Sequence, residues 1–310
     1  MEQVVGPARP PAPHPRPARR VGVVGAGRVG AVLGAALRDA GHDVVAVSAD
    51  SPVSRARAAA LLPGVAVRPP AAVAEACDVL LLAVPDDALE GLVEVLVTGG
   101  SLREGQYVVH TSGRHGLAPL AAATALGTRA VALHPALTFS GTAADLTRLA
   151  GCAVGVTAGP GEQRLAADLV ADLGGTVVDL AEEHRTLYHA ALAHGANHLV
   201  TVVAQAREAL VAAGVRDPAA VLRPLLEAAL DGALGRGDAA LTGPVVRGDA
   251  GTVAGHRQEL ARHAPQVLTA YDALAGATLD RVVADGRLDA VRAAGVRRAL
   301  GAHERQEARR

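Results

Sequence analysis

One short segment near the N-terminus constrains the fold more than any other part of the chain. The run VGVV over residues 21–24 is continuously apolar, which is typical of a strand buried on both faces of a parallel sheet. GAGRVG follows with the spacing G-x-G-x-x-G and leads into a helical pattern. In that context Gly25 allows a tight turn, Gly27 lets the backbone approach a pyrophosphate, and Gly30 lets the helix pack on the strand. The segment predicts a dinucleotide-binding turn; a glycine-rich turn without a ligand is the alternative.

Short apolar runs alternate with helical patterns as far as residue 180, and only helical periodicity follows. The predicted strands are 21–24, 44–47, 79–84, 107–111, 130–133, 152–157 and 176–180, and the predicted helices between them are 28–40, 51–62, 87–97, 117–126 and 163–173. This alternation predicts an α/β fold with a doubly wound parallel sheet. Further helices are predicted at 182–213, 219–234, 249–263, 266–285 and 288–300.

We therefore expect four parts in the chain. Residues 1–20 are rich in Pro and Arg and are predicted to form a flexible tail. Residues 21–181 form the dinucleotide-binding domain, and residues 182–303 form an all-helical domain for substrate binding and dimerisation. Residues 304–310 are predicted to fray.

Composition excludes several classes of function. The 30 basic residues against 31 acidic ones give a net charge of -1, which argues against binding to nucleic acid or to a membrane by bulk charge. The chain contains no lysine, so a Schiff base, a Walker A lysine and a lysine proton donor are all excluded. Cys77 and Cys152 are too few for a zinc ribbon or a disulfide framework. We expect a cytoplasmic protein without a metal, whose substrate is a small molecule.

The residues after the second predicted strand bear on the choice between NAD and NADP. An NAD site usually has Asp or Glu there to bind the ribose 2′-hydroxyl, but this strand ends at Ser48, with Arg55 and Arg57 nearby. Guanidinium groups and hydroxyls suit a 2′-phosphate, so we expect NADP, with NAD as the alternative. Either arginine could instead lie on a solvated helix face. The predicted cofactor-binding residues are Gly25, Ala26, Gly27, Arg28, Val29, Gly30, Ser48, Ser51, Arg55, Val84 and Pro85.

Polar side chains follow two neighbouring predicted strands, at the sheet edge where ligands bind in such folds. His110-Thr-Ser-Gly113 ends one strand and His134-Pro135 ends the next. Hydride transfer to a carbonyl or an imine needs a proton donor, and histidine is the natural choice in a chain without lysine. We expect His134 to be catalytic, with Ser112 and Asn197 as its supports. A core histidine bonded to the backbone is the alternative for His134, and the favoured interpretation for His110.

Four further residues are predicted to bind the substrate: Thr138, His194, Thr242 and Arg247. The segment around Thr242 and Arg247 is a polar turn before a helix, with Asp249 in the capping position. Helix capping and a dimer contact are equally good interpretations of that turn. His194 and His198 have the i, i+4 spacing of a metal pair, but no third ligand is evident, so we expect no metal site.

As a set, these motifs resemble a group of bacterial proteins described as proposed oxidoreductases, with a Rossmann-like domain and a C-terminal helical domain of unknown function. The matching stretches are the G-x-G-x-x-G, His110-Thr-Ser-Gly113, His134-Pro135 with Thr138-Phe139-Ser140-Gly141, Arg185 with Tyr188-His189, Ala196-Asn197, Leu241-Thr-Gly-Pro244 with Arg247-Gly-Asp249, and His256. The resemblance implies a helical domain like that of 6-phosphogluconate dehydrogenase, which pairs with a second copy in a homodimer.

The resemblance also implies an activity. The group is similar in plan to ketopantoate reductase and pyrroline-5-carboxylate reductase, which implies NADPH-dependent reduction of a small 2-keto or imino acid, with ketopantoate as one substrate to consider. Prephenate dehydrogenases carry a serine and a His-Pro at similar places, and by that likeness Ser112 and His134 polarise the reacting oxygen. Ketopantoate reductases use a lysine with a nearby asparagine, and this chain keeps only Asn197. The alternatives are prephenate-type oxidation and a dinucleotide-binding sensor without turnover.

Overall fold

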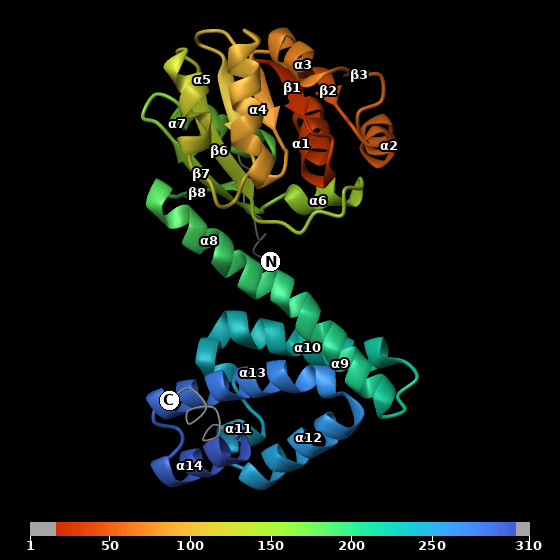
Figure 1. Ribbon diagram of the computed structural model, residues 1–310, viewed down its shortest axis with the longest axis vertical. Coiled ribbons are helices and arrows are strands. Elements are labelled where there is room, and N and C mark those ends of the chain that lie inside the picture. The colour runs from red at the N-terminus through yellow and green to blue at the C-terminus, as the bar shows by residue number, and fades with distance from the viewer. Residues whose placement is uncertain (1–16, 302–310) are drawn as a thin grey trace, which may run out of the picture. The chain divides into compact units, whose positions relative to one another are not determined.

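A computed structural model describes residues 17–301 (Figure 1). The chain divides into two compact units, with the boundary between Ala193 and His194. We call residues 17–193 the sheet unit and residues 194–301 the helical unit. The tails predicted over residues 1–20 and 304–310 lie outside the described residues, except for residues 17–20, the last of which begins the first strand.

The sheet unit is built on one eight-stranded sheet, in the order β3-β2-β1-β4-β5-β6-β7-β8. The strands are β1 Arg20–Val24, β2 Asp43–Ser48, β3 Ala66–Val67, β4 Val79–Leu82, β5 Tyr107–His110, β6 Arg129–Pro135, β7 Ala153–Ala158 and β8 Thr176–Asp179. The order around β1 is that of a Rossmann fold and confirms the predicted doubly wound sheet. The strands pair in parallel except β6 and β7, which are antiparallel. Periodicity could not predict this reversal, because a buried strand has the same pattern in either direction.

Helices cover both faces of this sheet, so its strands are apolar on both sides. They are α1 Arg28–Asp39, α2 Pro52–Leu61, α3 Pro70–Ala76, α4 Asp86–Thr98, α5 Ala121–Ala125, α6 Ala144–Leu149 and α7 Gln163–Asp172. The last helix of the unit, α8 Arg185–Leu192, contributes no residue to the core beside the sheet. One apolar cluster includes α1 and α7 residues, and a second, on the other face, includes α3 and α4 residues. Neighbouring strand residues such as Leu80 and Leu81 belong to different clusters, as the alternation of a strand requires.

The helical unit contains α9 His198–Ala212, α10 Pro218–Arg236, α11 Pro244–Arg247, α12 Ala250–His263, α13 Pro265–Ala284 and α14 Ala290–Ala299. The single helix predicted over 182–213 is an unbroken helical run in the structure: a 3₁₀ turn at Glu182–His184, then α8, a π-helical stretch at Ala193–Asn197, and α9. Asp217, Asp249 and Asp289 cap helices α10, α12 and α14 by accepting backbone N–H bonds. Within residues 17–301, no helix has the length and apolar character needed to cross a bilayer.

Candidate nucleotide-binding and catalytic site

The glycine turn lies between β1 and α1, where the order of the sheet reverses next to β4. Gly25 has a φ of 99°, and a Cβ there would lie 2.5 Å from the carbonyl oxygen of Ala83. Its N–H donates to the hydroxyl of Ser48 at 3.0 Å, and the N–H of Ala26 donates to the Ser48 carbonyl at 2.8 Å. Only glycine fits at this position, and the buried Ser48 side chain holds the turn from within.

Gly27 and Gly30 differ in what surrounds them. A Cβ at Gly30 would collide with the carbonyl oxygen of Gly25, which explains the third glycine by close packing. At Gly27, the nearest atom to a Cβ would be 4.0 Å away, so this glycine faces open space. Gly27 is also the N-cap of α1, a helix with no acidic residue in its first turn and no side-chain cap. Free N–H groups at an open helix N-terminus are the elements of a phosphate site.

The predicted ligands after β2 have partners within the protein. The Ser51 hydroxyl caps α2 by accepting from the N–H of Ser54 at 3.0 Å. Arg55 donates to the carbonyls of Ala49 and Asp50, at 3.3 and 2.7 Å. Both side chains are exposed and remain within reach of a ligand.

Arg57, which was not among the predicted cofactor ligands, lies closer to the turn than Arg55 does. It donates to the carbonyl of Ala26 at 3.3 Å. A Cβ at Gly141 would lie 2.6 Å from Arg57 Nε and 3.1 Å from Arg28 Cγ, so both arginines border the loop after β6. The sequence signal for Arg57 was its position on the same short helix as Arg55. Two guanidinium groups therefore flank the glycine turn.

One cavity of about 350 Å³ joins the glycine turn to the predicted catalytic residues. It is lined by Gly27, Arg28, Val29, Ala83, Val84, Pro85, Asp86, Thr111, Ser112, Gly113, His134 and His189. The structure thus brings together the predicted residues Gly27, Arg28, Val29, Val84, Pro85, Ser112 and His134. Thr138 is exposed and does not line this cavity.

His134 is partly buried at the end of β6, between two rings of α8. Its ring lies edge-on to those of Tyr188 and His189, with centroids 5.7 and 5.8 Å away. Its Nδ1 is 3.4 Å from the Tyr188 hydroxyl, and its Nε2 is near Gly113, where a Cβ would lie only 2.9 Å away. The pKa of His134 is lowered to about 4, mainly by burial and to a smaller extent by the neighbouring His189 and Arg185. The lowered pKa favours a neutral ring near pH 7, and the catalytic role of His134 stays a prediction.

His110 is completely buried and uses both ring nitrogens within its own loop. The N–H of Ser112 donates to Nδ1 at 3.2 Å, and Nε2 lies 2.6 Å from the carbonyl oxygen of Gly116. This pairing fits a neutral ring that carries its proton on Nε2. Burial lowers its pKa to about 4. His110 thus has the structural role favoured from the sequence, while the Ser112 hydroxyl accepts from the His115 N–H at 3.1 Å and keeps its own proton to donate.

The other predicted site residues belong to the helical unit. Asn197 and His194 are exposed in the π-helical stretch, and His194 Nδ1 lies 3.1 Å from His198 Nδ1. Arg247 is exposed at the end of α11, and Thr242 lines a groove within the helical unit. Their part in the site stays a prediction. Among residues 17–301, no cluster of three or more His, Cys, Asp or Glu side chains is suited to a metal.

Three residues at the start of α8 were missed as parts of the site: Glu182, Arg185 and Tyr188. Arg185 is completely buried and donates to the carbonyl oxygen of Ser112 at 2.8 Å. Tyr188 and His189 both contact the His134 ring, and His189 also lines the cavity. This segment has the sequence of a charged, exposed helix surface. The resemblance pointed to Arg185 and Tyr188, and no signal in the sequence pointed to Glu182.

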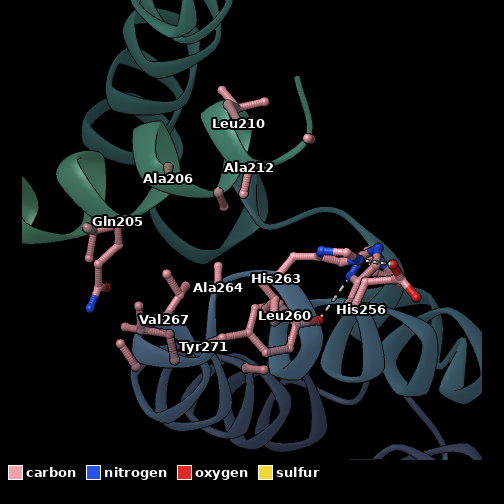
Figure 2. Close-up of a pocket in the computed structure, with 18 of the residues that line it drawn as sticks. Gln205, Ala206, Leu210, Ala212, His256, Leu260, His263, Ala264, Val267 and Tyr271 are labelled. Carbon is pink, nitrogen blue, oxygen red and sulfur yellow. Dashed lines mark hydrogen bonds and ion pairs between the residues drawn. The ribbon is translucent and has the colours of Figure 1, made fainter. Parts of the chain in front are cut away.

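A larger groove lies within the helical unit (Figure 2). Its volume is about 1020 Å³, and α9, α12 and α13 contribute most of its lining. The lining is mainly Ala, Leu and Val, and its polar groups include His256, whose Nδ1 lies 3.0 Å from the Tyr271 hydroxyl. In Figure 2, Gln205, Ala206 and Leu210 of α9 lie across the groove from Leu260 and Val267.

Two family models match this chain, and the second match crosses the boundary between the sheet unit and the helical unit. Residues 9–135 match the family described as a Rossmann-like domain, and residues 152–278 match the one described as a domain of unknown function (DUF2520). No curated protein matches the sequence.

Solved structures share the fold at low sequence identity. One is a candidate NADP oxidoreductase from Bacteroides fragilis, 21% identical with a TM-score of 0.73 over 85% of this chain and 98% of that one. An imine reductase from Myxococcus stipitatus in complex with NADP⁺ is 17% identical, with a TM-score of 0.65 over 86% of this chain and 95% of its own. A reductive aminase from Aspergillus terreus in complex with NADPH and ethyl-5-oxohexanoate is 16% identical, with a TM-score of 0.62 over 87% of this chain and 95% of its own. The chain thus joins an N-terminal Rossmann-like domain to a C-terminal helical domain of the DUF2520 type.

Proposed function

We propose that this chain is an NADPH-dependent reductase of a small keto or imino acid. The observation that carries the proposal is the single cavity that is lined both by the open glycine turn and by His134. A nucleotide bound at the turn and a substrate bound at His134 would then lie in one cavity, which would bring them close together as hydride transfer requires. The fold-sharing structures named as an imine reductase and a reductive aminase support a carbon–oxygen or carbon–nitrogen double bond as the target.

Several groups around the turn fit NADPH. The helix N-terminus at Gly27 would hold the pyrophosphate, and Arg28, Arg55 and Arg57 offer positive charge where β2 ends. No acidic residue ends β2 to bind a ribose 2′-hydroxyl, because Ser48 takes that place. When bound, NADPH would supply the hydride. NAD remains the second choice.

His134 acts in this proposal as a hydrogen-bond donor that polarises the substrate. If the Tyr188 hydroxyl donates to Nδ1, the proton of the neutral ring lies on Nε2, which is beside the cavity at Gly113. A neutral imidazole in this state stabilises a developing negative charge without first losing a proton. The Ser112 hydroxyl can donate a second hydrogen bond, and Asn197, Thr138, His194, Thr242 and Arg247 remain proposed substrate contacts.

NADPH binding tests the cofactor site. We expect the fluorescence of NADPH to change on titration with the protein and NADH to bind more weakly. Gly27→Ala should weaken NADPH binding about tenfold or more, because the new methyl group would occupy the open space at the turn. Its backbone conformation is ordinary, so the fold should be unchanged. Gly91→Ala is the matched control, since a Cβ there also meets nothing within 4 Å but lies on α4. Equal binding by both variants and the wild type would exclude the turn as the cofactor site.

Turnover tests the catalytic role. We expect NADPH oxidation with one compound in a panel of keto and imino acids that includes ketopantoate. His134→Asn should lower that rate by about 100-fold or more while NADPH still binds, and His184→Asn, at an exposed histidine, should not. Binding without turnover across the panel would favour a sensor, and reduction of NADP⁺ by prephenate would favour the oxidative alternative.

We also propose that the helical unit pairs with a second copy of this chain. Its helices α9 and α10 expose apolar side chains that a monomer leaves in water, including Val200, Val211, Leu225 and Leu234. The same unit has a mainly apolar groove beside α9, so one chain offers both an apolar ridge and an apolar recess. Analytical ultracentrifugation should find a dimer that Leu225→Glu dissociates. A monomeric wild type would refute the pairing.

A further inference from the structure

The sheet unit contains a completely buried arginine, Arg185. Its exposed fraction is 0%, and it is the largest of the fully buried side chains in the described residues. Within residues 17–301, no carboxylate lies within ion-pair distance of its guanidinium group, and its Nε has no hydrogen-bond partner. Burying a charge is costly unless it is paired and hydrogen-bonded, so a buried arginine without an ion pair calls for an explanation from its hydrogen bonds.

The guanidinium group of Arg185 binds residues at the ends of two strands that are far apart in sequence. Its NH2 group donates to the carbonyl oxygen of Ser112 at 2.8 Å, directly after β5. Its NH1 group donates to the Thr157 hydroxyl in β7 at 2.9 Å, and that hydroxyl donates to the carbonyl oxygen of Leu180 at 2.6 Å. The first residue of α8 is therefore tied to both strands at once.

A second tie runs from the same turn to the other end of the loop after β5. The carboxylate of Glu182, three residues before Arg185, accepts from the N–H of Leu117 at 2.7 Å and from that of Ala118 at 3.2 Å. We call residues 111–118 the site loop, because Thr111, Ser112 and Gly113 line the cavity. Arg185 and Glu182 thus bind the two ends of the site loop. The buried His110 ring binds the loop as well, through the carbonyl oxygen of Gly116.

The ties fix the surroundings of His134. Tyr188 lies one helical turn after Arg185 and His189 follows it, and the His134 ring contacts both. On its other side, a Cβ at Gly113 of the site loop would touch both His134 and His189. We propose that Arg185 is the positioning residue of this site, which holds the site loop and the start of α8 at the spacing that the His134 ring requires. The inference rests on the proposed function only for the catalytic role of His134.

The same arrangement has a consequence for charge. The groups that face His134 are Tyr188, His189 and Arg185 from α8, Asp86 from the start of α4, and His110 from β5. Burial is the main cause of the low pKa of His134, and the Arg185 charge adds to it, while Asp86 acts in the opposite direction. Removal of the guanidinium should therefore raise the His134 pKa in part.

An NMR titration of the free full-length protein tests this inference. The signal of His134 among the twelve histidines is identified by its loss in His134→Asn. Arg185→Met should shift the His134 titration midpoint upward, whereas Arg185→Lys, which keeps the charge, should leave it near the wild-type value. Arg257→Met is the matched control: it removes a partly buried arginine from the helical unit, where Arg257 pairs with Asp272 at 2.8 Å. It should not move the His134 midpoint.

An unchanged midpoint in a folded Arg185→Met protein, or an equal shift in the control, would overturn the proposal. If Arg185→Met does not fold, Thr157→Val decides, because it keeps the charge and removes one of its two acceptors. We expect the nuclear Overhauser contacts between His134 and Tyr188 to change in that variant, and unchanged contacts count against the proposal. These measurements use no substrate. A protein that reduces nothing would refute the proposed function and leave the result on Arg185 standing.

Discussion

In the sheet unit all four residues of β4 are buried, whereas in the helical unit α9 has fifteen residues and none of them is buried. β4 consists only of Val and Leu, and ten of the fifteen α9 residues are Leu, Val or Ala, so both segments carry apolar surface. The difference is one of partners: β4 lies in the middle of a sheet that is covered on both faces, while α9 borders an open groove. An apolar sequence predicts that a surface will be buried against other residues. Only the structure shows whether those residues belong to the same chain.

The two units also differ in how much core each one has. The sheet unit has two apolar clusters that extend over its whole width, and the helical unit has one smaller cluster that joins α11, α12, α13 and α14. The helical unit compensates with polar ties, such as the pair between Arg257 and the buried Asp272, which Arg257 contacts at 2.8 and 3.2 Å. We therefore expect the sheet unit to be stable alone. The helical unit should depend for its stability on a partner that covers its exposed apolar side chains.

Leu80→Ala should have the largest effect on this comparison. Leu80 is fully buried at the centre of the sheet, so its truncation leaves a cavity and should cost about 3–4 kcal/mol of unfolding free energy. Urea unfolding followed by circular dichroism measures this loss. The transition of the helical unit should keep its midpoint, because Leu80 belongs to a cluster of the sheet unit alone. A common shift of both transitions would show that the two units do not unfold separately.

Acid should destabilise the sheet unit selectively. The pKa of His110 is about 4 in the folded protein against an ordinary value of 6.5, so the unfolded chain binds more protons between these values. The contribution of His110 to the free energy of unfolding is fully present above about pH 6.5. It falls by roughly 2–3 kcal/mol as the pH is lowered toward 4. His134 acts in the same direction.

His110→Asn should therefore flatten the dependence of stability on pH, although it removes two hydrogen bonds at every pH. The measurement is urea unfolding at a series of pH values. His184→Asn, at an exposed histidine, should keep the wild-type slope. An unchanged slope in His110→Asn would mean that other groups govern the acid transition.

The main features of the fold could be predicted because buried parallel strands are continuous apolar runs. The sequence predicted seven of the strands and the helices between them, from β1 through β8, but not the two-residue β3 or the short helices α3 and α6. Each missed element is too short to show a period. α3 starts at Pro70, and α6 follows a polar loop. In both segments the residues typical of turns therefore obscure the helical pattern in the sequence.

The candidate site was predictable only where a residue type has few roles. Glycines at fixed spacing and a histidine at a strand end led to Gly27 and His134, which line one cavity. Serine has many roles, and the hydroxyls of Ser48 and Ser51, interpreted as cofactor ligands, are bound to the backbone. Arg185 could not be found from spacing, because its burial depends on contacts with Ser112 and Thr157 across the sheet.

Leu234→Ala should have the smallest effect on stability in a dilute monomer. A concentration-dependent effect of this substitution would therefore distinguish the helical unit from the sheet unit most clearly. Leu234 is 80% exposed on α10, so in a dilute monomer its truncation removes little buried area and should change stability by at most about 0.5 kcal/mol. If the helical unit pairs with a second copy through α9 and α10, the stability of the wild type should rise with protein concentration, and that of Leu234→Ala should rise less. Leu80→Ala should lose the same free energy at every concentration, since its partners lie within one chain. Thermal unfolding over a wide range of concentrations separates these cases: parallel curves for the wild type and Leu234→Ala would mean that this part of α10 faces water in solution.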